Sequence, residues 1–147
     1  MSSLSSSDAL KALAGFVLPE GVLDYFEVVN VKETTVLIDP DAKDRRGLYG
    51  KELEIYLDEL DNRTSDMSGA TGNGFTENRK ILDFPVRDHK TILHIRRRRW
   101  LMPDGSSRTV NLEDKFQLAH PGTRYAKDFA FFFKDGVWTM RRLQYHP

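Results

Sequence analysis

The chain contains no cysteine among its 147 residues, which excludes disulfide bonds, thiolate catalysis and zinc sites built on cysteine. Histidine is scarce, and the four histidines are scattered, at His89, His94, His120 and His146. No stretch approaches the roughly 18 consecutive apolar residues of a membrane helix. The serine-rich N-terminus also lacks the basic and apolar regions of a secretory signal. We therefore expect a cytoplasmic protein that holds no metal and no other cofactor.

Catalytic motifs are missing as well. The glycine-rich stretch 68–74 lacks the Gly-Lys-Ser/Thr ending of a phosphate-binding loop. Asp58, Asp61 and Asp66 resemble an acidic cluster for two-metal chemistry, but surface carboxylates at a strand end and in a loop explain them more simply. No serine, histidine and acid arrangement follows from the spacing. We expect no catalytic residues, and hence a protein that is not an enzyme.

The composition is that of a folded domain. Hydrophobic residues make up 39% of the chain and aromatic residues 11%, which argues against general disorder, while 30% of the residues are charged. The length suits one domain with a real hydrophobic core. We therefore expect residues 1–147 to form a single domain.

Charge divides the chain although the net charge is zero. Residues 1–78 carry 7 Lys and Arg against 15 Asp and Glu, a net charge of −8. Residues 79–127 carry 12 against 5, a net charge of +7, and the remainder carries 3 against 2. A field this uneven makes one region attractive to phosphates. The acidic region is expected to be a solvated face, or to shield the basic region or contact a basic partner.

The acidic subregion 1–60 is expected to begin with two short helices, over residues 7–15 and 19–25. Strands are then predicted over residues 26–32, 36–38 and 53–59, because β-branched residues and alternation of apolar with acidic residues are typical of half-buried strands. The only stretch of low complexity, residues 61–76, is rich in Gly, Ser and Asn and is expected to be a linker.

The basic subregion, residues 77–135, is expected to hold a β-hairpin and a helix. Strands 81–86 and 90–101 flank a turn at 87–89, and a Pro-Asp-Gly turn at 102–105 leads to a returning strand at 108–110. Aromatic spacing predicts a helix over 123–134, ended by Gly136 at the start of a tail, 136–147. The fold class is α+β, a small antiparallel sheet or hairpin meander with short N-terminal helices and a C-terminal helix.

Four consecutive arginines, Arg96 to Arg99, followed by Trp100, stand at the end of the apolar run Thr91 to Ile95. Basic tails that bind nucleic acid are usually disordered, but this cluster is mounted on a predicted strand. Alternation along a strand places Arg96, Arg98 and Trp100 on one face, and Arg97 and Arg99 on the other. Guanidinium groups there can fork onto phosphates or stack on bases.

These residues, with nearby cations, predict a nucleic-acid-binding surface. Its expected members are Arg96, Arg97, Arg98, Arg99, Trp100, His94, Arg87, Lys90, Arg108 and Arg124. The competing interpretation is that the arginines pair with the acidic subregion of the same molecule. His94 has a packed core position as its alternative, and Trp100 can equally be a core anchor or a base-stacking side chain.

Four segments carry a resemblance to a known family: Asp83-Phe84-Pro85-Val86, Thr91 to Ile95, Arg96 to Trp100, and His120-Pro121-Gly122-Thr123-Arg124-Tyr125. Together they resemble the N-terminal region of bacterial insertion-sequence transposases of the ISL-three type, and within it the Aon-one group. In that family, an Asp-Leu-Pro strand and a Leu-His-hydrophobic-Arg-Arg-Arg-Phe/Trp strand lead into a Cys-x-x-Cys zinc knuckle and a helical DNA-binding region. The resemblance covers roughly residues 17–134.

Two departures shape what the resemblance implies. Where the family places Cys-x-x-Cys, this chain has Met102-Pro103-Asp104-Gly105, so the hairpin is expected to survive with an ordinary turn and without zinc. The acidic catalytic domain with which such transposases cut and join DNA is also absent from this chain. The resemblance therefore implies a separately encoded recognition part, with catalysis in a partner polypeptide.

The sequence thus predicts a non-catalytic part of a transposase that binds element-end DNA, most simply the terminal inverted repeats, and associates with the nucleoid. Two alternatives stay open. One is a protein interaction module whose basic face docks on an acidic partner, such as the transposase catalytic core. The other is an RNA-binding module that uses the same arginines and an exposed aromatic.

Overall fold

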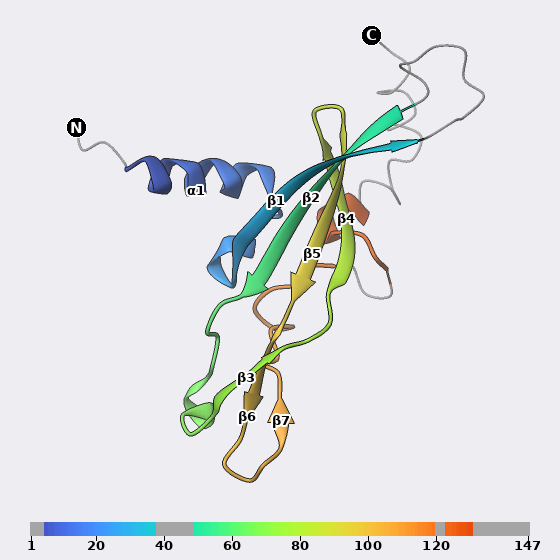
Figure 1. Cartoon of the computed structure of the whole chain (residues 1–147). Coiled ribbons are helices and arrows are strands. Elements are labelled where there is room, and N and C mark those ends of the chain that lie inside the picture. The colour runs from blue at the N-terminus through green and yellow to red at the C-terminus, as the bar shows by residue number, and fades with distance from the viewer. Residues whose placement is uncertain (1–4, 38–48, 120–122, 131–147) are drawn as a thin grey trace.

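The computed structural model describes residues 5–37, 49–119 and 123–130. It has two sheets and a few short helices, so the predicted α+β class is confirmed (Figure 1). The elements, with η for 3-10 helices, are α1 (Ser6–Val17), η1 (Val22–Asp24), β1 (Phe26–Leu37), β2 (Tyr49–Glu59), η2 (Ser65–Met67), β3 (Thr71–Phe75), β4 (Arg79–Val86), β5 (His89–Arg96), β6 (Arg98–Leu101) and β7 (Ser107–Arg108).

The larger sheet has four strands in the order β1-β2-β5-β4. Two antiparallel hairpins, β1 with β2 and β4 with β5, lie side by side because β2 and β5 pair in parallel. This central pairing joins the acidic subregion to the basic one. Its register sets Tyr56 beside His94 and Asp58 beside Arg96. The parallel pair is the part of this sheet that local sequence patterns do not predict.

One face of the larger sheet packs the core. Alternate residues of the central strands point into it, among them Ile55 and Leu57 of β2 and Leu93 and Ile95 of β5. Burial of such side chains stabilises each by about 1.5–3 kcal/mol. The same alternation on β2 brings Glu59 to this side, where it is fully buried. An acidic residue thus continues the apolar row at the end of the strand.

The smaller sheet has three strands in the order β3-β6-β7, and it projects beyond the end of the larger sheet (Figure 1). Its strand β3 lies within residues 61–76, so the prediction of a linker there was wrong. Met67 and Ala70 are buried in the core, and β3 pairs with β6. Gly69 packs closely against Pro103 and leaves no room for a side chain, since a Cβ at Gly69 would lie 2.9 Å from Cγ of Pro103.

Both predicted turns of the basic subregion are present. The β4–β5 hairpin turns at Arg87 and Asp88, where Arg87 adopts a φ of 58°. The β6–β7 hairpin turns through residues 102–105, with Gly105 at a φ of 86°, a backbone angle that glycine adopts without strain. The predicted strand 90–101 is divided between the two sheets, because Arg97 separates β5 from β6.

Other boundaries differ by a few residues. Helix α1 begins earlier than expected because Ser5 is its N-cap, and the Oγ of Ser5 accepts the N–H of Asp8. Only residues 22–24 of the predicted second helix are helical, and the two strand segments expected within 26–38 form one strand as far as Leu37. The predicted helix 123–134 is helical over 127–130 but not over 123–126, and residues 131–134, Gly136 and the tail lie outside the described residues.

Candidate functional site

The arginine run lies at the junction of the two sheets, where β5 ends at Arg96 and β6 begins at Arg98. The intervening residue is held through its backbone. Its N–H donates to Oγ1 of Thr76 at 3.0 Å, and its carbonyl accepts the N–H of Thr76 at 2.8 Å. The run is therefore a fixed joint in the fold, and each side chain leaves it in a defined direction.

Arg96 forms a fork with Asp58 on the neighbouring strand. Nε donates to Oδ1 at 2.7 Å and Nη2 donates to Oδ2 at 2.5 Å. The parallel register of β2 and β5 places the two residues side by side, and this hydrogen-bonded carboxylate raises the pKa of Arg96. The arginine side chain keeps 45% of its surface exposed, whereas Asp58 keeps 10%. Paired guanidinium and carboxylate groups of this geometry are the strong class of charged hydrogen bonds.

Arg97 satisfies the buried carboxylate of Glu59. Its Nε donates to Oε1 at 2.8 Å, and its Nη2 also donates to the carbonyl of Val110. Glu59 has no exposed surface, and its other donors are the backbone N–H of Arg98, at 2.8 Å from Oε1, and Nδ2 of Asn62, at 2.9 Å from Oε2. Burial of a carboxylate is tolerated when it is paired and hydrogen-bonded in this way.

Arg98 also turns inward. Its Nε donates to the carbonyl of Glu59 at 2.6 Å. Its guanidinium carbon lies 4.9 Å from the ring centre of Phe75, and that of Arg96 lies 4.4 Å from the same ring. The predicted common face of Arg96 and Arg98 is confirmed by this shared contact, which is a cation–π arrangement.

Three of the four arginines thus bind residues at the end of β2. Their contacts are those of the competing interpretation, in which the arginines pair with the acidic subregion of the same molecule. Arg99 differs from them. Its side chain is exposed and forms no ion pair with any described residue. It belongs to β6, and the exposed Arg108 stands on the adjoining strand β7, where it pairs with Trp100 in the sheet register. These two are the cations that the projecting sheet offers to solvent.

The remaining predicted cations are exposed but are not brought to this place. Arg87 and Lys90 lie at the β4–β5 turn, the opposite end of β5 from the arginine run. At about 3.3 Å per residue, a strand of 8 residues separates the two ends by about 26 Å. Arg124 lies elsewhere again, on a segment whose backbone pairs with β4: its carbonyl accepts the N–H of Leu82 at 2.7 Å.

His94 and Trp100 occupy core positions, which corresponds to the packed alternative stated for each of them. His94 is 4% exposed, stacks on Tyr56 at 4.2 Å between ring centres, and hydrogen-bonds with Glu54 and Asn78. The hydrogen bond with His94 lowers the pKa of Glu54. Trp100 is 5% exposed, and burial within the projecting sheet makes it a core anchor.

Sequence reasoning missed the residues that complete this site. Arg63 places its guanidinium carbon 4.4 Å from the ring of Trp100, and Phe75 receives Arg96 and Arg98. Glu59 had a readable signal, because Leu53, Ile55 and Leu57 precede it at alternate positions on the core face. Arg63 and Phe75 had none, since both lie in the stretch whose composition resembles a linker.

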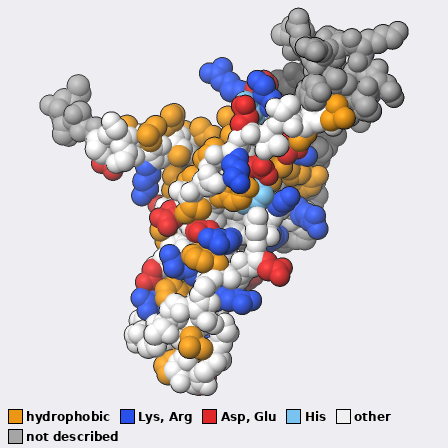
Figure 2. All heavy atoms as spheres, viewed as in Figure 1, with side chains coloured by type: hydrophobic (Ala, Val, Ile, Leu, Met, Phe, Trp, Pro, Cys, Tyr) orange, Lys and Arg blue, Asp and Glu red, His pale blue; other side chains and the backbone are white. Residues whose placement is uncertain are grey.

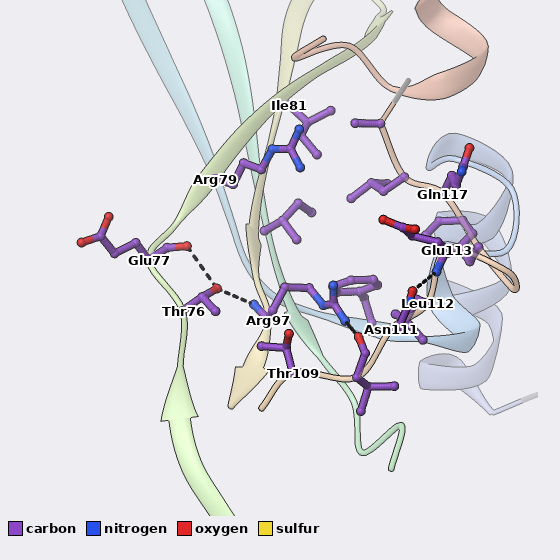
Figure 3. A pocket seen from close by; sticks show the side chains of 16 residues that line it. Thr76, Glu77, Arg79, Ile81, Arg97, Thr109, Asn111, Leu112, Glu113 and Gln117 are labelled. Carbon is purple, nitrogen blue, oxygen red and sulfur yellow. Dashed lines mark hydrogen bonds between the residues drawn. The ribbon is translucent and has the colours of Figure 1, made fainter. Parts of the chain in front are cut away.

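A cavity of about 650 Å³ opens on the core side of the sheet beside Arg97 (Figure 3). Arg79 and Arg97 line it together with apolar side chains such as Ile81 and Leu112. Arg97 is already paired with Glu59, and Glu113 adds a carboxylate to the lining. The cavity therefore offers mixed, largely balanced charge, and it contains no arrangement of nucleophile, base and acid.

Within the part of the chain that the structure describes, no three His, Asp or Glu side chains are placed to hold a metal ion. No helix among those residues has the length and apolar character needed to cross a membrane. The chain matches no protein-family model, no curated protein and no solved structure.

Proposed function

We propose that this chain is the non-catalytic DNA-binding part of an insertion-sequence transposase and that its projecting β6–β7 hairpin contacts the element ends. The observation that carries the proposal is the placement of Arg99 and Arg108 on neighbouring strands of that hairpin, both exposed and neither in an ion pair with a described residue. Arg108 is in register with Trp100 and shares its face of the sheet, whereas Arg99 lies on the other face, so the hairpin presents one cation on each side. A two-stranded ribbon fits the major groove of DNA, and exposed arginines bind phosphates or guanine edges there.

Arg96, Arg97 and Arg98 have a supporting role in this proposal. By binding Asp58 and Glu59, they fix the start of β6 to the end of β2. A hairpin held in place before binding loses less conformational entropy on contact with DNA. The resemblance to the transposase family, strongest between Asp83 and Trp100, supports the choice of element-end DNA, and catalysis then belongs to a separate polypeptide.

The alternative of RNA binding loses support from the burial of Trp100. That interpretation needed an exposed aromatic on which a base stacks, and Trp100 is 5% exposed. Docking of the basic face on an acidic protein would use the same two exposed arginines. The binding experiment below distinguishes it from DNA binding.

The proposal is tested by measuring the affinity of the purified chain for duplex element ends, random duplex and single-stranded RNA over a salt series. We expect duplex binding that weakens as salt rises, with preference for the element ends. Absence of duplex binding at low salt would overturn the proposal. Equal affinity for all three nucleic acids would leave only nonspecific attraction and would contradict recognition of element ends.

A further inference from the structure

Helix α1 is a helix with no buried residue. Its apolar side chains are exposed: Leu10 by 65%, Leu13 by 60%, Phe16 by 90% and Val17 by 43%. Figure 2 shows hydrophobic side chains gathered over this helix and where it joins the body of the molecule. These side chains lie close together on one short helix, and contiguous apolar patches of this kind mark contact surfaces.

The spacing of these residues suits contact with another helix. Leu10, Leu13 and Val17 follow one another at intervals of three and four residues, which is the spacing of a helix–helix seam. Phe16 flanks the same stripe. At 1.5 Å per residue, the 12 residues of α1 form a rod of about 18 Å. A helix this short is marginally stable alone in water, so a covering surface would stabilise it.

Strand β1, the next strand in the chain, adds a second set of exposed apolar side chains. It is an edge strand of the larger sheet, and Val28, Val29 and Val31 are 38%, 49% and 54% exposed. A standard protein interface buries about 800 Å² per partner, and the exposed parts of these valines and of the α1 stripe are together of that order. The exposed apolar area thus comes near what one partner contributes to a standard interface.

The charge of the surface indicates which partner fits. Helix α1 carries Asp8 and Lys11 as its only charged residues, and their charges cancel. A neutral apolar stripe gives no attraction to a nucleic acid or to a strongly charged protein. An identical stripe can pack against it without repulsion between like charges. In an antiparallel arrangement the two helix dipoles also point in opposite directions, which is electrostatically favourable.

We propose that α1 is the contact surface between two copies of this chain, which pack their α1 helices antiparallel about a two-fold axis near Leu13. Leu10 of one copy then faces Val17 of the other, and the two Leu13 side chains meet at the axis. Phe16 and the β1 valines cover the flanks. This proposal concerns a surface separate from Arg99 and Arg108 and does not depend on DNA binding.

The mass of the full chain in solution tests the proposal. Light scattering across a concentration series should approach twice the 16.9 kDa of one chain. The variant Leu13→Glu/Phe16→Glu should remain monomeric at the same concentrations, because burial of two carboxylates in an apolar seam is unfavourable. The control Lys11→Glu changes a charge on the same helix outside the stripe and should dimerise as the parent does. A parent chain that stays monomeric, or a double variant that still dimerises, would overturn the proposal.

The absence of cysteine allows a second test that does not depend on destabilising the seam. A single cysteine at Leu13→Cys should give disulfide-linked dimers on mild oxidation, since the two positions meet at the axis. The variant Ser7→Cys should not, because antiparallel packing carries the two N-terminal ends apart. Equal cross-linking of both variants would contradict the antiparallel arrangement, and no cross-linking at position 13 would contradict the seam.

Discussion

Glu59 is the residue on which the arginine run depends. It has no exposed surface, and it accepts hydrogen bonds from Arg97, Asn62 and the backbone of Arg98. Part of the arginine cluster, which the sequence suggests is a binding patch, is therefore held inside the molecule by its contacts with Glu59. Removal of one partner of such a buried pair leaves an uncompensated charge, which is the costly case for buried ions.

The variants Glu59→Ala and Arg97→Ala should each lower the free energy of unfolding by about 3–5 kcal/mol. The double variant should cost much less than their sum, because the pair is then removed together. Urea unfolding of the four proteins measures this coupling. Glu77→Ala, at an exposed glutamate on the same side of the junction, should change stability by less than about 0.5 kcal/mol. Additive losses would show that the pair does not act as one unit.

Asp83 is a second buried carboxyl group, 7% exposed, and burial raises its pKa from 3.8 to about 6. Its Oδ1 accepts the N–H of Phe84 at 2.8 Å, and nearby Asp128 also opposes ionisation. The pKa of Asp83 in the folded chain lies above its value in the unfolded chain. Below pH 3.8 the carboxyl group is protonated in both states, and its burial then does not reduce the free energy of unfolding. This free energy falls as pH rises from about 4 to 6, where the unfolded chain ionises more readily than the folded one.

The variant Asp83→Asn should therefore be more stable than the parent at pH 7, by on the order of 2 kcal/mol, since one pKa unit corresponds to about 1.4 kcal/mol. The two proteins should be nearly equal at pH 3.5. Thermal unfolding of both across pH 3.5 to 7 measures the difference. A variant that is less stable than the parent at pH 7 would show that the charged form of Asp83 has a stabilising partner.

At the scale of elements, local patterns predicted most of the strands and both turns of the basic subregion. Alternation marks β2, and the Asp-containing and Pro-Asp-Gly segments mark the turns of the two hairpins. The segment around β3 was misread because Gly, Ser and Asn are as typical of linkers as of a short strand whose pairing partner stands far along the chain. The amino-acid composition of this segment does not reveal that its backbone forms hydrogen bonds with β6.

Two neighbouring glycines test whether this segment is packed. The variant Gly69→Ala should lower the free energy of unfolding by about 1–3 kcal/mol, because its Cβ would meet Pro103 at 2.9 Å. At Gly72 a Cβ meets nothing within 4 Å, so Gly72→Ala should be neutral or slightly stabilising. Urea unfolding compares the pair. Equal tolerance of both changes would mean that the segment behaves as a linker after all.

At the scale of the whole molecule, the two charge regions of the sequence are interleaved in the fold. The parallel pairing of β2 and β5 sets Asp58 beside Arg96 although 38 positions separate them in the sequence. Pairing between strands far apart in the sequence leaves no local signal. The sequence therefore revealed the arginine cluster but did not identify the residues that bind it. The same pairing leaves Arg99 and Arg108 as the exposed cations of the projecting sheet. The central claim of the functional proposal is that these two arginines contact DNA while Arg96, Arg97 and Arg98 hold the hairpin in place.

The most direct test of that claim compares the salt dependence of DNA affinity for two matched double variants. Arg99→Ala/Arg108→Ala removes two exposed cations from the projecting sheet, and Arg87→Ala/Lys90→Ala removes two from the opposite end of β5. If the hairpin holds the DNA, the first variant should reduce the slope of log affinity against log salt by about 1.8, which corresponds to two phosphate contacts. The second should leave the slope unchanged. Equal reductions in both variants, or none in the first, would contradict the proposal.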